Sequence, residues 1–246
     1  MRRLAGVANR ALLSVTGRVL DRAYLIPHLP PPRLTAHQGL YEQVVALGDK
    51  PGFRILEVGS REVTGSYGLR RRLRHAQYVG FDYYQGPNVD VAGDAHRLSE
   101  LVEDRFDLVF STAVFEHLAM PWVAAEEIAK VLKPGGHLLV ETHFAYSAHE
   151  RPWHFFQFSD MGLRALFSPA LGFEVIEATM QNPIVGRFSA FADRYLRFRP
   201  VTALYCHATI LARKVRDVPD FRWRDVALSE VVGETAYPKP SALSSG

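Results

Sequence analysis

Short apolar runs alternate with stretches of helical periodicity along most of the chain. Four of these runs have the length and composition of buried parallel strands, namely residues 54–59 (RILEVG), 78–82 (YVGFD), 106–111 (FDLVFS) and 137–142 (HLLVET). The clearest helix covers residues 123–132 (VAAEEIAKVL), and its apolar positions share one face. The sequence KPGG follows and ends this helix. This alternation predicts an α/β fold with a doubly wound, mostly parallel sheet and helices on both faces.

Further elements are expected on either side of this region. A helix is predicted over residues 40–47, and another begins after Ser159, which is a good N-cap residue. The last two strands are expected at residues 173–178 and 204–212. Residues 182–200, which lie between them, are expected to contain a helix that covers the sheet edge or serves in a homodimer. Its aromatic face would consist of Phe188, Phe191 and Tyr195.

The first 22 residues have a basic and amphipathic pattern, with five arginines beside apolar residues at helical spacing. Two interpretations stay open, a helix packed over the domain as a lid and a helix docked on an anionic membrane surface. Prolines within residues 27–32 end this helix. We therefore expect an N-terminal helical extension or lid at residues 1–50, a main domain at 51–215 and a C-terminal tail at 216–246.

Composition limits the function more than the fold. The 246 residues carry a net charge of +3 with 22% charged side chains, which argues against the strongly basic surface of a nucleic-acid-binding protein. Cys206 is the only cysteine and cannot form an internal disulfide, so a reducing, cytoplasmic location is expected. No run approaches the roughly 20 apolar residues of a membrane-spanning helix. These limits predict a soluble cytoplasmic protein without a nucleic-acid partner.

The carboxyl ends of the first strands have residues suited to a nucleoside cofactor. Gly59 follows the first strand, and glycine allows a sharp turn close to a ligand. Asp82 ends the second strand, where a carboxylate can accept both hydroxyl hydrogens of a ribose. Asp94 stands beside the small Ala95 and can hydrogen-bond an adenine amino group, or serve as a turn residue. Gly59 and Gly65 lack the spacing of the dinucleotide fingerprint, which argues against a nicotinamide enzyme.

Five motifs, read in order, resemble the class I S-adenosylmethionine-dependent methyltransferases. They are LEVGS (56–60), the acidic Asp82, GDAHRL (93–98), FDLVFSTAVFEHL (106–118) and LKPGGHLLVE (132–141). The resemblance covers about two thirds of the chain and makes the main domain a methyltransferase domain. It implies a seven-stranded Rossmann-like sheet with an antiparallel final strand and S-adenosylmethionine lying across the strand ends.

The same resemblance implies which residues hold the cofactor. Glu57 and Gly59 would lie near its methionine part, Asp82 would bind the ribose, and Asp94 with Ala95 would meet the adenine. The expected set is Glu57, Gly59, Ser60, Asp82, Tyr83, Asp94, Ala95, Ser111 and Ala113. The sequence departs from the family in one place, because residues 60–64 separate Gly59 from the next glycine. The contacts of this loop therefore stay open.

Histidines after the fourth main strand are the candidates for catalysis. An alcohol loses its proton as it attacks a methyl group, and a positioned base accelerates such a reaction by roughly 10² to 10⁴. His143 directly follows the strand end and is the first choice as base, whereas His149 and His154 lie in the loop beyond it. Aromatic side chains of this loop can stack on a sugar ring or a phenol. They are Trp153, Phe155, Phe156 and Phe158.

A metal ion is a lesser expectation for the acceptor site. Glu141, Glu150, His149 and His154 have suitable ligand atoms, but their spacing matches no strong metal signature, so no metal residue is assigned.

The sequence therefore predicts a methyltransferase that acts on a hydroxyl of a small molecule, a saccharide or a secondary metabolite. Two alternatives stay open. The first is a methyltransferase for a lipid or quinone at the membrane surface, which only the basic N-terminal helix favours. The second is a non-catalytic module that binds S-adenosylmethionine.

Overall fold

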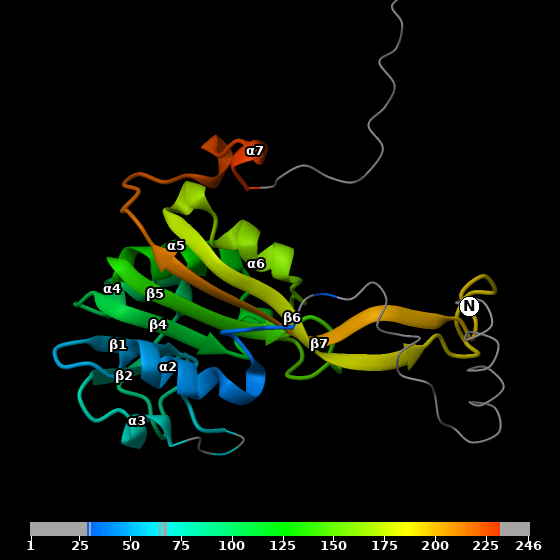
Figure 1. Ribbon diagram of the computed structural model, residues 1–246, viewed down its shortest axis with the longest axis horizontal. Helices are drawn as coiled ribbons and strands as arrows, with labels where there is room; N and C mark the ends of the chain where they lie inside the picture. The colour runs from blue at the N-terminus through cyan, green and yellow to red at the C-terminus, as the bar shows by residue number, and fades with distance from the viewer. Residues whose placement is uncertain (1–28, 30, 64, 66–67, 232–246) are drawn as a thin grey trace, which may run out of the picture.

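Seven strands form one sheet in the computed structural model, which describes residues 29, 31–63, 65 and 68–231 (Figure 1). Their order across the sheet is β3-β2-β1-β4-β5-β7-β6. The strands are β1 (Arg54–Val58), β2 (Gln77–Asp82), β3 (Val91–Ala92), β4 (Phe106–Thr112), β5 (Leu132–His143), β6 (Phe173–Arg187) and β7 (Pro200–Lys214). β7 is antiparallel to both of its neighbours, and the other pairs are parallel. The predicted doubly wound, mostly parallel seven-stranded fold is confirmed.

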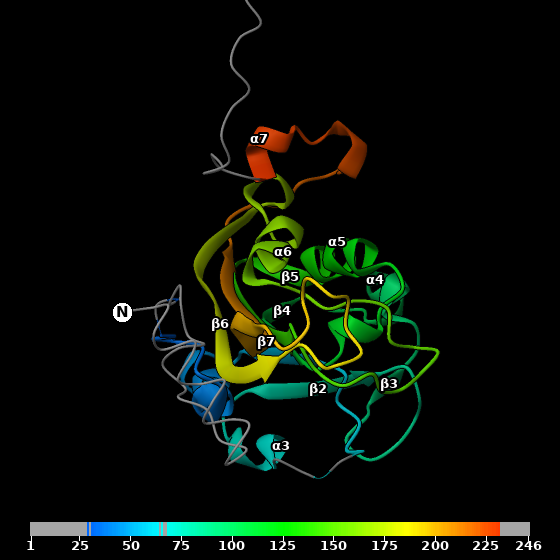
Figure 2. The same ribbon diagram turned by 90° about the vertical axis from the view of Figure 1, so that its right-hand side faces the viewer.

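Helices cover both faces of the sheet (Figure 2). They are α2 (Leu40–Gly48), α3 (Leu69–Arg72), α4 (Leu98–Leu101), α5 (Pro121–Val131) and α6 (Asp160–Leu166). A further short helix, α7 (Leu228–Val231), lies away from the sheet and has no buried residue. Neighbouring strand residues point to opposite faces. Ile55 therefore packs with α2 and α3, while Leu56 packs with α4, α5 and α6. Because apolar residues of β1 and β4 pack on both faces of the sheet, these strands appear in the sequence as nearly continuous apolar runs.

Several local predictions are confirmed with small shifts at their ends. The helix expected at 123–132 is α5, which begins two residues earlier at Pro121, a residue suited to the first helical turn. Ser159 caps α6, because its Oγ accepts a hydrogen bond from the backbone N–H of Gly162 at 3.1 Å. The helix expected at 40–47 is α2, and Leu40 and Val44 bury against the sheet. The domain limits at residues 50 and 215 stay a prediction.

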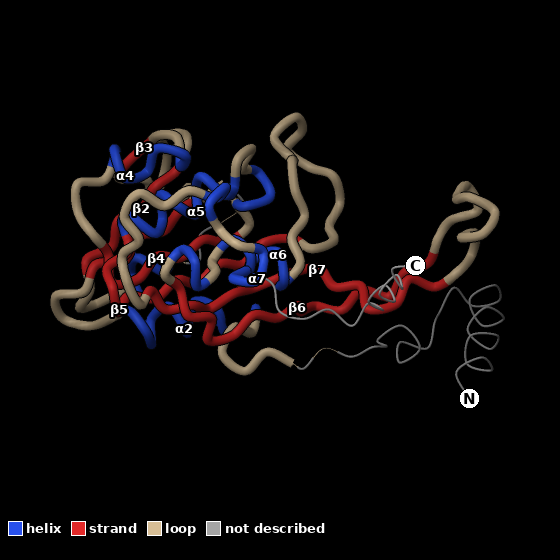
Figure 3. Tube along the Cα trace, turned by 90° about the horizontal axis from the view of Figure 1, so that it is seen from above, coloured by secondary structure: helices blue, strands red, loops and turns tan. Residues whose placement is uncertain are grey.

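The helix expected within residues 182–200 is wrong. β6 and β7 instead continue past the end of β5 as a two-stranded ribbon, and residues 188–199 connect them (Figures 1 and 3). Asn182 has a φ of 56° and Pro183 follows it, and neither fits a regular helix. Phe191 is 99% exposed, so the aromatic spacing that suggested a helical face covers nothing within the described residues.

Two further predictions concern the chain ends. The amphipathic helix at residues 1–22 and the last 15 residues lie outside the described part of the chain. None of the helices in the described ranges is long and apolar enough to cross a membrane.

Candidate active site

Predicted cofactor residues gather at the carboxyl ends of β1, β2 and β4. The sheet order reverses between β1 and β4, and such a point is where doubly wound sheets bind ligands. Gly59 follows β1 with a φ of 88°, and an added Cβ would lie 2.1 Å from Cγ2 of Val114. Ser111 donates a hydrogen bond from Oγ to the carbonyl oxygen of Val58 at 2.8 Å. Ala113 has a φ of 53°, which few non-glycine residues adopt. The backbone at this edge is therefore closely packed and fixed in shape.

Asp82, the last residue of β2, presents its carboxylate to the loop that follows β1. The backbone N–H of Arg61 donates to Oδ2 at 3.2 Å, and that of Tyr84 donates to Oδ1 at 3.1 Å. Nε of Arg61 also lies 3.3 Å from Oδ1. Two backbone donors thus hold the carboxylate, while the arginine side chain is a partner that a ribose could replace. Tyr83 is half-exposed beside it, with its ring centroid 5.4 Å from that of Trp153.

Glu57 and Ser60 are bound to neighbouring protein groups. The hydroxyl of Tyr78 donates a hydrogen bond to the buried carboxyl of Glu57. Asn88 donates from Nδ2 to that hydroxyl at 2.9 Å and to the carbonyl oxygen of Ser60 at 3.0 Å. Burial raises the pKa of Glu57 to about 7, although the bond from Tyr78 acts in the opposite direction. Contact of Glu57 and Ser60 with a cofactor stays a prediction.

The thermal stability of the protein is expected to depend on protonation of Glu57. Its pKa rises from 4.5 to about 7 on folding, so the folded state binds the proton more tightly than the unfolded state. This contribution is complete below the unfolded pKa and is lost as the pH rises through the folded one. Glu57→Gln keeps an uncharged side chain, so its Tm relative to wild type should rise between about pH 5 and about pH 8.

Thermal unfolding across this pH range measures the effect. Glu42→Gln is the matched control, because that carboxylate is exposed and pairs only with Arg72 among the described residues. A Tm difference for Glu57→Gln that does not change with pH would contradict the raised pKa of the carboxyl.

Asp94 and Ala95 lie at the start of a short 3-10 helix after β3. Asp94 caps it, since Oδ1 accepts from the backbone N–H of His96 at 3.0 Å and from Nδ1 of its ring at 2.6 Å. The Asp94 side chain is 47% exposed, and no bond of the second carboxylate oxygen to a described residue is found. Ala95 is buried beside it. Asp94 thus caps this 3-10 helix, and its contact with an adenine stays a prediction that the second carboxylate oxygen leaves open.

His143 ends β5 next to a buried carboxylate. Its Nδ1 lies 2.6 Å from Oε1 of Glu116, in a contact that is not aligned as a hydrogen bond. Glu116 is fully buried in the 3-10 helix Phe115–His117, and Oε2 accepts from the Thr142 hydroxyl at 2.5 Å. Burial alone would raise the pKa of Glu116, but the contacts with His143 and Thr142 outweigh it and keep that pKa below its usual range. The site therefore contains an ionised carboxylate beside an imidazole.

The loop after β5 brings the other candidate histidines to the same place. The ring of His149 is T-shaped against that of His143 at 5.4 Å, and the ring of His154 lies 4.7 Å from that of His149. Tyr146 stacks on His143 at 4.4 Å. The three predicted histidines thus form one cluster. Two of the aromatic residues expected to meet a substrate, Phe156 and Phe158, pack into the core instead, whereas Trp153 and Phe155 are about half exposed.

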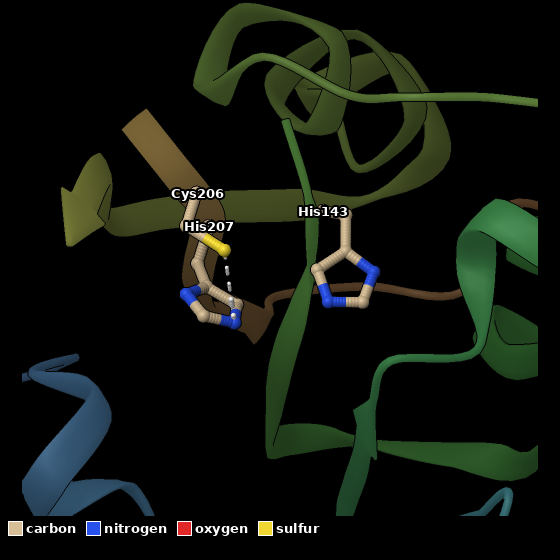
Figure 4. A group of neighbouring side chains, drawn as sticks. All are labelled: His143, Cys206 and His207. Carbon is tan, nitrogen blue, oxygen red and sulfur yellow. Dashed lines mark hydrogen bonds between the residues drawn. The ribbon is translucent and has the colours of Figure 1, made fainter. Parts of the chain in front are cut away.

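The metal ligands considered from the sequence do not converge as a set. Glu141 is buried, and its carboxylate oxygens lie 2.9 Å from Nδ1 of His37. Three groups of possible ligand atoms lie close together among the described residues, and none of them combines Glu141 with His149 or His154. Those groups combine other residues: His143, Cys206 and His207; His37, Glu141 and His207; and Glu116, His117 and His149. Figure 4 shows the first group, in which His143 from β5 faces His207 from β7.

Sequence reasoning missed His37, His117 and His207 as members of this cluster. Together with His143, His149 and His154 they make six of the ten histidines of the chain. Their convergence depends on the pairing of β5 with β7, which sets His143 opposite His207. The high histidine count was the only signal in the sequence.

Known proteins share this fold. Residues 56–140 match the family described as "Methyltransferase domain". A protein of Bacillus halodurans C-125 with a provisional methyltransferase assignment has 15% identity and a TM-score of 0.53, covering 73% of this chain and 99% of its own. A chain from the complex of the Haloferax volcanii Trm112 methyltransferase activator with its provisionally assigned methyltransferase has 18% identity and a TM-score of 0.50, covering 74% and 92%.

TehB from Haemophilus influenzae has 17% identity and a TM-score of 0.48 over 73% of this chain, which spans 63% of TehB. No curated protein matches the sequence. At these identities the solved structures support the fold alone. The domain match and the fold together support a class I methyltransferase that uses S-adenosylmethionine.

Proposed function

We propose that the protein is a cytoplasmic enzyme that methylates a hydroxyl group of a small molecule, with a saccharide or a secondary metabolite as acceptor. The observation that carries this proposal is the buried pair of His143 and Glu116 at the end of β5. Methylation of nitrogen or sulfur in a neutral or anionic acceptor does not need a strong base, whereas a hydroxyl does. An imidazole oriented by a buried carboxylate is the arrangement that supplies one.

The cofactor residues would hold S-adenosylmethionine at the neighbouring strand ends. When bound, it supplies a methyl group on a positively charged sulfur. Asp82 would bind the ribose hydroxyls in place of the Arg61 side chain, and the free oxygen of Asp94 would meet the adenine. Only glycine fits at position 59, because its φ is 88° and Cγ2 of Val114 would lie 2.1 Å from an added Cβ, so the turn beside the cofactor keeps this shape. Alignment of acceptor oxygen, methyl carbon and sulfur accounts for much of the rate.

His143 would act on the methyl acceptor. With Nδ1 directed to the Glu116 carboxylate, Nε2 is the nitrogen that accepts the hydroxyl proton. The acceptor oxygen, having given its proton to Nε2, would take up the methyl group that the bound cofactor supplies. The buried negative charge of Glu116 stabilises the imidazolium that results. His149 and His154 lie farther from a carboxylate and are second choices as base.

Binding and turnover test the proposal separately. We expect calorimetry to show S-adenosylmethionine binding, and labelled methyl groups to appear on the oxygen of at least one member of a panel of saccharides and phenols. Binding without turnover on any acceptor would favour a non-catalytic module. Labelling of nitrogen or carbon acceptors alone would contradict a hydroxyl acceptor.

A further inference from the structure

Two imidazole nitrogens face each other beside the proposed base. Nε2 of His117 and Nε2 of His149 are 3.2 Å apart, and the ring centroids are 4.8 Å apart at nearly a right angle. Both rings are partly exposed, so an ion from solvent can reach the two nitrogens.

The other nitrogen of each ring is bound to a backbone carbonyl. Nδ1 of His117 lies 2.5 Å from the carbonyl oxygen of Trp153, and Nδ1 of His149 lies 2.8 Å from that of Ser147. A carbonyl only accepts, so each Nδ1 carries the proton. In the neutral rings both Nε2 atoms therefore present lone pairs to each other. Two lone pairs at this distance repel unless a proton or a metal ion is shared by the two nitrogens.

Glu116 completes the group. Its Oε1 lies 3.9 Å from Nε2 of His117, and the ligand atoms of Glu116, His117 and His149 all lie within 4.8 Å of one another. Glu116 is fully buried, and the nearest group to Oε1 among the described residues is Nδ1 of His143 at 2.6 Å, which is not aligned as a hydrogen bond. Because no aligned bond uses the lone pairs of this oxygen, they can serve a cation beside the imidazole.

We propose that Glu116, His117 and His149 bind a divalent transition-metal ion, with Zn²⁺ as the expected occupant. Metal-binding histidines usually donate the second ring nitrogen to a backbone carbonyl or carboxylate, as both do here. The 3.2 Å between the two nitrogens fits a tetrahedral ion, since bonds of about 2.0 to 2.1 Å place two ligands about 3.3 Å apart. Two imidazoles with one carboxylate suit Zn²⁺ far better than Mg²⁺.

The two neighbouring groups are less suited to a metal. His37 and Glu141 already satisfy each other at 2.9 Å. Nδ2 of Asn182 lies 2.8 Å from Nδ1 of His207, and since an amide nitrogen donates, the proton of His207 is on Nε2. That nitrogen points at Sγ of Cys206, 3.7 Å away (Figure 4). No bare nitrogen of His207 remains for an ion in either group.

Three protein ligands leave the fourth tetrahedral position open, which is typical of catalytic zinc. Nδ1 of His143 lies 2.6 Å from the same Glu116 oxygen, so the ion would adjoin the base. An acceptor oxygen could then bind the ion and lose its proton more readily. This consequence rests on the proposed function, whereas binding of the ion does not.

Metal titration of the full chain tests the site without any assay of methyl transfer. After removal of metal with a chelator, wild type should bind one Zn²⁺ per chain in competition with a chromogenic chelator, and millimolar Mg²⁺ should not displace it. Co²⁺ should give the intense visible absorption of a tetrahedral site. Loss of a residue that only orients a metal ligand weakens metal binding by up to about 100-fold. His117→Ala and His149→Ala each remove a ligand itself, so each should weaken Zn²⁺ binding by at least that factor.

Two further variants serve as controls. His75→Ala removes an exposed histidine on the opposite side of the fold and should bind Zn²⁺ as wild type does. His207→Ala should also bind it, because His207 belongs only to the other two groups. Circular dichroism of each metal-free variant shows whether it is folded. No stoichiometric Zn²⁺ in wild type, an octahedral Co²⁺ spectrum, or loss of binding in His207→Ala with retention in His149→Ala would each overturn the proposal.

Discussion

Replacing His143 with alanine is expected to lower the rate of methyl transfer by about 10² to 10⁴, with the affinity for S-adenosylmethionine nearly unchanged. A base acts in the transition state, so its loss reduces kcat more than it affects binding of the cofactor. The side chain is buried beside Glu116 at the end of β5, and its removal leaves no other imidazole of the described residues within hydrogen-bond distance of that carboxylate. Steady-state kinetics with a labelled methyl donor, and calorimetry on the same preparation, measure both quantities.

His137→Ala is the matched control for this substitution, because His137 lies in the middle of the same strand, six residues before His143. If His143→Ala keeps its rate while His149→Ala or His154→Ala loses it, the base lies in the loop. If all three variants keep their rates, Glu116 or Glu141 acts instead, or the acceptor is already ionised.

Replacing Asp82 with alanine is expected to weaken S-adenosylmethionine binding by about 10-fold to 150-fold, the equivalent of one charged hydrogen bond of about 1.5 to 3 kcal/mol. The carboxylate is placed by the backbone N–H groups of Arg61 and Tyr84, so it is oriented before any ligand binds. Calorimetry of folded protein measures the loss.

Arg61→Ala distinguishes the two roles of this contact. It removes the side chain that now meets Oδ1 but keeps the backbone donor, so cofactor affinity should stay within a few-fold of wild type or rise. Unchanged affinity in Asp82→Ala would show that the ribose binds elsewhere. A similar loss in both variants would instead point to the shape of the loop after β1.

The core strands could be predicted because they are buried on both faces. In β1 and β4, apolar residues face both sides of the sheet, and this produces the nearly continuous apolar runs typical of a parallel strand, interrupted only by Glu57 in the first and Asp107 in the second. The Ser159 cap is a local signal, and the structure has it at the expected residue. In the ribbon, residues 183–187 of β6 and 200–205 of β7 pair only with each other among the described strands, so burial imposes no pattern that a sequence would show.

The candidate site was predictable only in part, for a different reason. Gly59, Asp82 and His143 each follow a strand, so the parallel topology brings them to one edge of the sheet. His117 and His207 reach the same cluster through a 3-10 helix after β4 and through pairing of β5 with β7. Such contacts depend on register and on the path of a loop, which no periodicity in the sequence reports.

The ribbon gives β7 two different kinds of surroundings along one strand. From His207 to Lys214 the strand is bonded on both sides, by β5 and by β6, and most of its side chains are buried. From Pro200 to about Tyr205 it has β6 alone, and an isolated pair of strands is only marginally stable in water. In terms of hydrogen exchange, a single continuous strand thus belongs to two cooperative units, one that opens only with the whole domain and one that opens by itself.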